Sequence, residues 1–227
     1  MVDAVAAGIG LIMSAPLLVV AAFAVWISSP GPILFRQPRV GLHGRLFTLL
    51  KFRSMRIAGE GPQVTAGDDR RITPAGRFLR KSKLDELPEL WNVLCGDMAF
   101  VGPRPEVPKY VDLNDIRWQR VLSVRPGLTD PVTLRLRNEE ALLSEVTGDR
   151  ENFYQSVLSP WKLYGYQRYL RSRSFRTDIC IIIKTIIAIF DNKNVKQPTQ
   201  EELSAFRDFH KSNIKTVSDA TKREKDI

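Results

Sequence analysis

The sequence predicts an α+β fold that is predominantly helical and is held at a membrane by its first helix. Three observations carry this prediction. Residues 4–27 form one apolar stretch, and residues 33–40 and 45–52 form two short segments typical of a β-hairpin. The remaining chain contains helical patterns separated by proline and glycine. A chain of 227 residues has room for one globular domain with an appendage.

The apolar stretch predicts a membrane helix. Its 24 residues carry no charge and would extend roughly 36 Å as a helix, more than a hydrocarbon core of about 30 Å. Pro16 lies near its middle and is expected to bend the helix, with the Ser14 hydroxyl as partner for a freed carbonyl. The residues alone favour a kinked span over a helix–break–helix hairpin. A cleaved signal peptide is opposed by Asp3 and by the lack of basic residues before the stretch.

The positive charge of the chain is concentrated in one segment. The net charge is +9, and residues 36–83 hold twelve Lys and Arg against three acids. The positive-inside rule therefore places everything after residue 35 in the cytoplasm. Such a segment predicts a basic face against anionic lipid, a site for a phosphorylated substrate, or both.

The hairpin and the helix after it have clear local signals. Alternation along residues 45–52 and beyond places Lys51 and Arg53 on one face, either as a solvated basic edge or as phosphate ligands. Thr73 and Pro74 predict an N-cap and a first-turn proline, which start a basic helix.

An acid pair opens the next helix. Pro88 is tolerated only in a first turn, so the helix is expected to begin at Leu84 or Asp85 and to end at Gly96. Asp85 and Glu86 then lie at the positive end of the helix dipole. Three roles remain open for the pair: helix capping with ion pairing, oxygen ligands for a divalent metal, or a nucleophile that forms an acyl phosphate.

Two stiff segments follow. Residues 101–105 hold Arg104 between two prolines, so its guanidinium is presented with little entropy to lose, which suits phosphate recognition. Residues 125–127 form a second rigid element that contains Arg125.

The last third of the domain suggests further contact with the membrane. From residue 159 the chain is aromatic and basic, which predicts an amphipathic interfacial helix or a helix packed on the core. Residues 179–190 are apolar but too few to span a bilayer. Residues 59–69 predict a mobile loop, and the charged segment 191–227 is expected to be flexible.

Several function classes are disfavoured. Cys95 and Cys180 lie in apolar runs and are expected to be reduced and buried. With His43 and His210 as the only histidines, neither a zinc site nor a histidine-based triad is expected. The basic stretch has few aromatic residues, so nucleic acid is not an expected partner.

The order of these motifs resembles that of a known family, the bacterial sugar transferases that are monotopic phosphoglycosyl transferases. The resemblance covers most of residues 8–190. It is carried by residues 31–41, 51–55, 69–73, 76–80, 84–88, 92–94, 96–98, 101–105 and 125–129.

The resemblance implies transfer of a sugar phosphate from a UDP-sugar to a polyprenol phosphate such as undecaprenyl phosphate. The products would be a polyprenyl-diphosphate-sugar and UMP, as the first membrane step of glycoconjugate assembly. Asp85 matches the family's nucleophile, and Glu86 matches a second catalytic acid that would assist proton or metal handling. Asp85 and Glu86 together match the family's Mg²⁺ site. The implied phosphate-binding residues are Arg104, Lys51, Arg53 and Arg125.

The resemblance also implies a topology. Residues 1–30 would form a re-entrant membrane helix broken at Ser14 and Pro16, in place of a span. Residues 31–190 would form the catalytic domain at the cytoplasmic face of the bacterial inner membrane, followed by the charged segment 191–227. Downstream glycosyltransferases are implied partners. Residues 130–140 depart from the pattern of many members, so the donor sugar is not identified. A membrane-anchored scaffold for polysaccharide assembly is the rival hypothesis.

Overall fold

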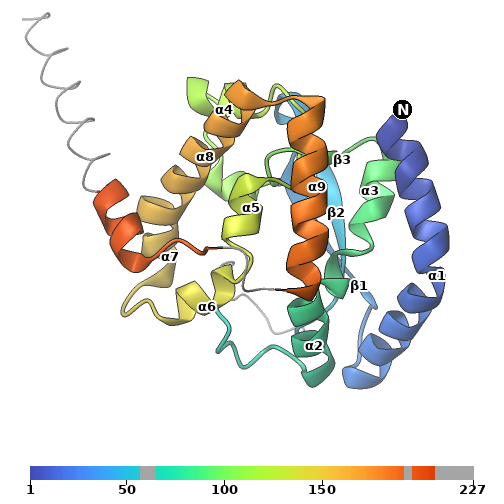
Figure 1. Ribbon diagram of the computed structural model, residues 1–227. Coiled ribbons are helices and arrows are strands. Elements are labelled where there is room, and N and C mark those ends of the chain that lie inside the picture. The colour runs from blue at the N-terminus through green and yellow to red at the C-terminus, as the bar shows by residue number, and fades with distance from the viewer. Residues whose placement is uncertain (57–64, 192–195, 208–227) are drawn as a thin grey trace, which may run out of the picture.

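A computed structural model describes residues 1–56, 65–191 and 196–207 of the chain. Most of these residues are helical, and the strands form two small two-stranded sheets, which confirms the predicted α+β class (Figure 1). The helices are α1 (Val2–Ser28), α2 (Pro74–Ser82), α3 (Glu89–Cys95), α4 (Ile116–Val121), α5 (Pro131–Arg135), α6 (Glu139–Ser144), α7 (Arg150–Phe153), α8 (Ser159–Ser172) and α9 (Phe175–Phe190). The strands are β1 (Leu34–Val40), β2 (Leu46–Phe52), β3 (Ala99–Val101) and β4 (Gly127–Thr129).

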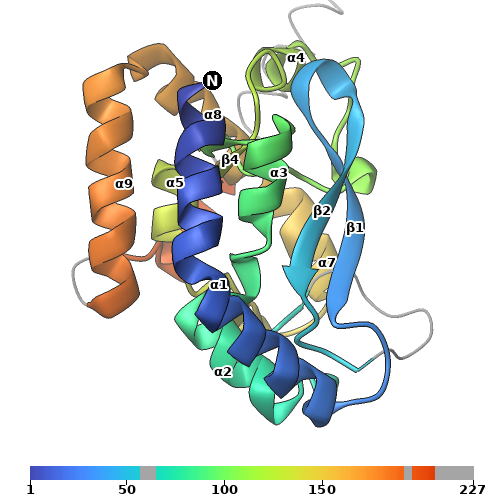
Figure 2. The same cartoon turned by 90° about the vertical axis from the view of Figure 1, so that its right-hand side faces the viewer.

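Helix α1 continues through Pro16 and is bent near its middle (Figure 2). Pro16 leaves the carbonyl of Ile12 without its helical donor. The Ser14 hydroxyl donates instead to the adjacent carbonyl of Leu11, at 3.4 Å. Within the part of the chain that the structure describes, α1 is the one helix long and apolar enough to cross a membrane.

One narrow face of α1 packs on the domain and the rest is exposed. Ala7 packs with Val93 of α3, and Ala21 packs with Leu79 of α2. The opposite face is strongly apolar and open, with Met13 78% exposed. A helix that is apolar on its exposed faces suits a lipid environment.

The β1–β2 hairpin has the predicted position and is antiparallel, with Val40 opposite Leu46. Helix α3 is fastened to it by a side-chain amide. The Asn92 Oδ1 atom accepts a hydrogen bond from the Leu50 amide at 3.1 Å, and its Nδ2 atom donates to the Thr48 carbonyl at 2.8 Å. The hairpin and α3 therefore form one unit.

The second sheet pairs β3 with β4 in parallel, with Val101 opposite Thr129. Just beyond β3, the segment at Gly102 approaches the start of β4 so closely that a Cβ atom on Gly127 would overlap the backbone of Gly102. Only glycine fits this approach. It holds the start of the loop that carries Arg104 against β4.

Helix α8 packs one face into the core and exposes Tyr164, Arg168 and Arg171 on the other, so its predicted interfacial position stays a prediction. Trp161, Tyr166 and Tyr169 are all nearly buried. Its basic residue Lys162 is buried too, because the acids Glu106 and Glu139 lie beside its ammonium group. The buried aromatic residues and Lys162 therefore serve internal packing and ion pairing, as the alternative interpretation expected.

Part of the C-terminal segment also packs on the domain. Residues 200–207 are helical, Leu203 is completely buried in the main core cluster, and the Phe206 ring lies 5.6 Å from the Tyr164 ring. The expected flexibility is therefore wrong for this part. Residues 59–64 of the predicted loop, and residues 192–195 and 208–227, lie outside the described residues.

The prediction that both cysteines are buried is wrong. Cys95 and Cys180 are exposed and free. They lie on α3 and α9, whose apolar sequences continue onto surfaces that the domain does not cover. On α9 the exposed residues include Phe175 and Ile183. In α3 and α9, an apolar sequence therefore contributes residues to the exposed surface as well as to the core.

Candidate active site

One cavity of about 480 Å³ brings together three of the predicted site residues, Lys51, Glu86 and Arg104, whereas Asp85 is not among the residues that line it. Lys51 reaches it from β2, Glu86 from the segment before α3, and Arg104 from the loop after β3. Further cations that sequence analysis did not select also line it. These are Arg39, Arg80, Lys83, Arg137 and Lys162.

The acid pair lies in a short 3-10 turn, Leu84–Glu86, and α3 begins only at Glu89. The predicted helix start at Leu84 or Asp85 is therefore wrong. Lys83 ends α2 in a left-handed conformation, with φ 60°, and this turns the chain before the acids. Pro88 occupies the N-cap of α3, and Gly96, with φ 84°, ends the helix as predicted.

Glu86 is held by two cations. Its Oε1 atom lies 3.0 Å from the Lys51 Nζ atom and 2.6 Å from the Arg104 Nη2 atom. Burial alone would raise the pKa of Glu86, but Arg104 and Lys51 together hold it well below its ordinary value. Glu86 is therefore ionised at neutral pH.

Asp85 is the less neutralised member of the pair. It is 7% exposed, and its Oδ1 atom has no hydrogen-bond partner among the described residues. Burial, followed by the charge of Glu86, raises the pKa of Asp85, and Lys51 opposes that rise. A carboxylate with a free oxygen and incomplete charge compensation suits nucleophilic attack.

Glu89 is a third acid that sequence analysis missed. It is fully buried, 3.2 Å from Lys51 and 3.6 Å from Arg104, and neither of its carboxylate oxygens has a hydrogen-bond partner within the described chain. Burial raises its pKa. The available signal was its spacing, four residues after Asp85, together with its place as the single acid in an apolar helix.

Arg104 is positioned by both backbone and carboxylate. Its Nη1 atom donates to the Leu128 carbonyl at 3.2 Å, while its Nη2 atom contacts Glu86. The backbone contact holds the side chain beside β4, and the guanidinium lines the cavity.

Two predicted phosphate ligands do not line the cavity. Arg53 is buried elsewhere and donates to the carbonyls of Ser29 and Pro30, each at 2.6 Å. These carbonyls follow the end of α1, where helix geometry leaves acceptors unpaired. Arg125 is exposed and is not a lining residue. Its segment serves the structure through its backbone, beside Gly102.

Asp85 and Glu86 carry the oxygen ligands that a Mg²⁺ site would need. Carboxylate oxygens are its preferred protein ligands, and it usually binds one or two of them together with substrate phosphates. Among the residues that the structure describes, no group of three or more potential ligand side chains is arranged for a metal. The free Asp85 Oδ1 atom and the cavity-lining Glu86 nevertheless fit a site that substrate oxygens complete.

Comparison with known proteins gives a consistent family match. The model of a family described as bacterial sugar transferase matches residues 1–192. A UDP-glucose:undecaprenyl-phosphate glucose-1-phosphate transferase of Caulobacter vibrioides is 37% identical over 198 residues, which cover 85% of this chain and 69% of the relative. A transferase of the same name from Escherichia coli strain K12 is 34% identical over 197 residues, covering 84% of this chain and 40% of the relative.

A further relative carries a different sugar in its name. The UDP-N-acetylgalactosamine-undecaprenyl-phosphate N-acetylgalactosaminephosphotransferase of Aeromonas hydrophila is 43% identical over 134 residues, which cover 56% of this chain and 31% of the relative. The chain thus spans about two thirds of the Caulobacter relative and well under half of the other two.

Proposed function

The chain belongs to the bacterial sugar transferase family, and we propose that it transfers a sugar-1-phosphate from a UDP-sugar to undecaprenyl phosphate or a related polyprenol phosphate. The relatives' names support this donor and acceptor class. The observation that carries the proposal is Asp85, a buried carboxylate with one unpaired oxygen that directly precedes Glu86, and Glu86 lines a cavity together with Lys51 and Arg104. Relatives named for glucose and for N-acetylgalactosamine leave the sugar open.

The proposed reaction has two steps. In the first, Asp85 attacks the sugar-linked phosphorus, the bond from that phosphorus to the bridging oxygen breaks, and UMP leaves with the oxygen. In the second, an oxygen of the polyprenol phosphate attacks the same phosphorus and releases the Asp85 carboxylate. The products are UMP and the polyprenyl-diphosphate-sugar, which downstream glycosyltransferases would extend.

The residues of the cavity supply charge and position. Lys51 and Arg104 would stabilise negative charge on the phosphate oxygens as the transition state forms. Glu86, which holds both cations in the free protein, would exchange part of these contacts for the substrate. Asp85 and Glu86 would hold Mg²⁺, which supplies further neutralisation of the diphosphate.

The packing of α1 supports a re-entrant topology. Ala7, near one end of the helix, packs with Val93, while Ala21 and Val25, near the other end, pack with Phe52. A straight span would carry one of these ends away from the domain to the far side of the bilayer. We therefore propose that the bend at Pro16 returns α1 to the cytoplasmic face of the bacterial inner membrane.

The function is tested by measuring UMP release from a panel of UDP-sugars, with Mg²⁺ and a polyprenol phosphate in detergent. We expect release with at least one donor. The Asp85→Asn variant should lose at least about a thousandfold in turnover and should form no phosphosugar adduct visible by mass spectrometry of the intact protein. Asp112→Asn, an exposed aspartate distant in sequence, is the matched control and should keep full activity. Full activity of Asp85→Asn would exclude it as the nucleophile.

A further inference from the structure

The cavity has two chemically different ends, and the reaction steps above use only one of them. Its charged end carries Lys51, Glu86 and Arg104. A neighbouring part of the lining, called the apolar end below, adjoins the charged end where Arg104 donates to the Leu128 carbonyl. It is formed by aliphatic and aromatic side chains from α3, β3, β4 and α9. These are Leu90, Phe100, Leu128, Ile182, Ile186 and Ile189.

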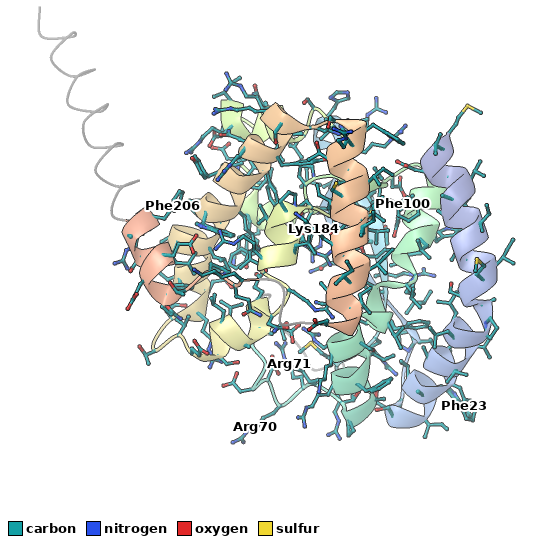
Figure 3. All side chains as sticks on the ribbon, in the orientation of Figure 1. Phe23, Arg70, Arg71, Phe100, Lys184 and Phe206 are labelled. Atoms are coloured by element: carbon teal, nitrogen blue, oxygen red, sulfur yellow. The ribbon has the colours of Figure 1, made fainter. Side chains whose placement is uncertain are left out.

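Helix α9 forms the outer wall of this apolar end. Ile182, Ile186 and Ile189 follow one another at helical spacing and line the cavity, whereas Ile183 does not. Phe100 lies between two clusters, since it packs both with Ile181 of α9 and with Val93 of α3. Figure 3 shows Phe100 beside α9 on the side that faces α3.

Helix α9 is held in place by a polar contact at the boundary between the two ends. The hydroxyls of Thr129 and Thr185 lie 2.7 Å apart. Because the Thr185 hydroxyl donates to the Ile181 carbonyl at 2.8 Å, Thr129 is the donor of the pair. This contact ties α9 to β4, so the apolar wall has a defined position beside the charged end.

The apolar end reaches the surface where the molecule is itself apolar. The outward face of α9 exposes Ile179 and Ile183, and α1 exposes residues such as Ile12. In Figure 2, α9 stands at one edge of the molecule and the first half of α1 stands upright in front of its middle, with α5 visible between them. A ligand with an apolar chain could pass from lipid into the cavity without leaving apolar surroundings.

We propose that this apolar end is the subsite for the phosphate-proximal isoprenoid units of the lipid acceptor. The inference rests on the proposed function and names which surface of the cavity takes the acceptor. The acceptor phosphate would face Lys51 and Arg104, and its first isoprene units would lie against Ile182, Ile186 and Phe100. Contact between branched hydrocarbon and isoleucine is favourable because it removes apolar surface from water.

The donor does not fit this end. A UDP-sugar is polar or charged over its whole length, and placing its hydroxyls against isoleucine would leave them without hydrogen-bond partners, which is costly. The two substrates therefore occupy different ends of one cavity and meet at the carboxylates. This arrangement suits two successive reactions at one phosphorus.

Two isoleucines of α9 provide a matched test. Ile186 is 51% exposed and lines the cavity, while Ile183 is 50% exposed and does not. Changing either one to asparagine removes the same apolar group from the same helix, and half-exposed positions are tolerant of such changes. Any general loss of membrane or detergent affinity should therefore be equal in the two variants.

The measurement separates the two half-reactions. With UDP-sugar and no acceptor, rapid-quench release of UMP reports the first step. With saturating donor, steady-state rates against acceptors of one and of several isoprene units report the second. We expect Ile186→Asn to raise the KM for the longer acceptor by about tenfold, to reduce the preference for it over the shorter one, and to leave the UMP burst unchanged. Ile183→Asn should change none of these more than about twofold.

Each other result overturns the inference. An equal rise in acceptor KM for Ile183→Asn would mean that lipid partitioning, and not a subsite, was measured. A slower UMP burst in Ile186→Asn would assign this end of the cavity to the donor, and unchanged kinetics in Ile186→Asn would assign it to neither. Absence of UMP release from the wild-type protein with every donor would instead refute the proposed function, and this inference with it.

Discussion

At the scale of single residues, the main feature of the site is the unequal charge compensation of its carboxylates. Two carboxylates, Glu86 and Glu89, share two close cations, Lys51 and Arg104, while Asp85 forms no ion pair with either cation and is influenced by the charge of Lys51. Glu86 makes the shorter contact with both cations and is therefore the best compensated. The pKa values of the other two carboxyl groups are raised by burial. The site thus keeps one carboxylate firmly ionised and leaves its neighbours easier to protonate.

The first prediction concerns pH and the nucleophile. Asp85 must be ionised to attack, and Lys51 is the largest opponent of the burial that raises its pKa. Replacing Lys51 by methionine should raise the Asp85 pKa, so the acid limb of the rate profile should move to higher pH. The measurement is the burst of UMP release between about pH 4 and 8.

A loss of rate without movement of the acid limb would contradict this prediction, since Lys51 would then act on the substrate alone. Lys109→Met serves as the control, because that exposed lysine pairs with Glu151 and does not line the cavity. Its acid limb should match that of the wild-type protein.

A second prediction concerns stability at Glu89. Since its folded-state pKa is raised, the folded protein binds this proton more tightly than the unfolded chain does. Stability from this group is therefore greatest at low pH and falls as pH rises through the folded pKa. Glu89→Gln does not ionise, so its Tm should exceed that of the wild-type protein at neutral pH, with about 2–4 °C for each kcal/mol gained.

Glu151 gives the opposite case. Burial would raise its pKa, but hydrogen bonds from Lys109 and Tyr110 lower it, so its stabilisation is present at neutral pH and lost in acid. Glu151→Gln should therefore lower the neutral-pH Tm. If the Tm falls for Glu89→Gln as well as for Glu151→Gln, Glu89 stabilises the protein as an ion-pair partner. That result would contradict the higher Tm expected for Glu89→Gln.

At the scale of elements, α3 and the hairpin act together because of Asn92. The amide satisfies a donor and an acceptor of β2 at once and is nearly buried. Asn92→Leu keeps the volume and removes both bonds, which should cost about 1–3 kcal/mol for each unsatisfied backbone group. Thermal or urea unfolding in detergent measures this loss.

The same substitution tests the geometry of the site. Because α3 begins at Glu89, next to the acid pair, loosening α3 should also lower the UMP burst rate. Asn114→Leu is a suitable control, since Asn114 is exposed on a turn. Unfolding of Asn92→Leu at the wild-type denaturant concentration would contradict the role assigned to the amide.

Elements with local signals were predictable from sequence. The hairpin, the Thr73 cap and the Gly96 end are each determined by a few neighbouring residues, and the structure has them all. The start of α3 was not predictable from sequence, because the left-handed conformation of Lys83 adds a 3-10 turn that no local residue signals. Likewise α8 has the composition of an interfacial helix, and the burial of its core face depends on the distant acids that pair with Lys162.

The site was predictable in part for the same reason. Asp85, Glu86 and Arg104 lie in stiff motifs that present them in one way. Arg53 lies two residues after Lys51 and shares its predicted face, but the carbonyls at the end of α1 take its guanidinium instead. That competition involves a segment 24 residues away, which alternation along a strand does not encode.

At the scale of the whole molecule, the membrane determines which apolar surfaces are acceptable. The exposed faces of α1 and α9, and the exposed Cys95 and Cys180 on α3 and α9, would be defects on a protein surrounded by water. They agree with a domain that rests on a bilayer, from which the proposed reaction would take its lipid acceptor.

The last prediction tests the re-entrant helix by labelling from outside the cell. Helix α1 has 27 residues, roughly 40 Å if straight, which exceeds the hydrocarbon core, whereas either arm around Pro16 is roughly 20 Å and does not. In a background with Cys95→Ser and Cys180→Ser, which removes both native thiols, a Val2→Cys variant should resist a membrane-impermeant thiol reagent in spheroplasts and react after lysis.

Asn114→Cys, on an exposed turn of the catalytic domain, should behave identically to Val2→Cys, because both would lie on the cytoplasmic side. Labelling of Val2→Cys in intact spheroplasts, with Asn114→Cys still protected, would establish a span. Adding Pro16→Ala restores the missing backbone hydrogen bond and favours a straight helix. If the bend holds both ends of α1 on one side, this substitution should increase outside labelling at position 2 and lower the activity that depends on the packing of both arms.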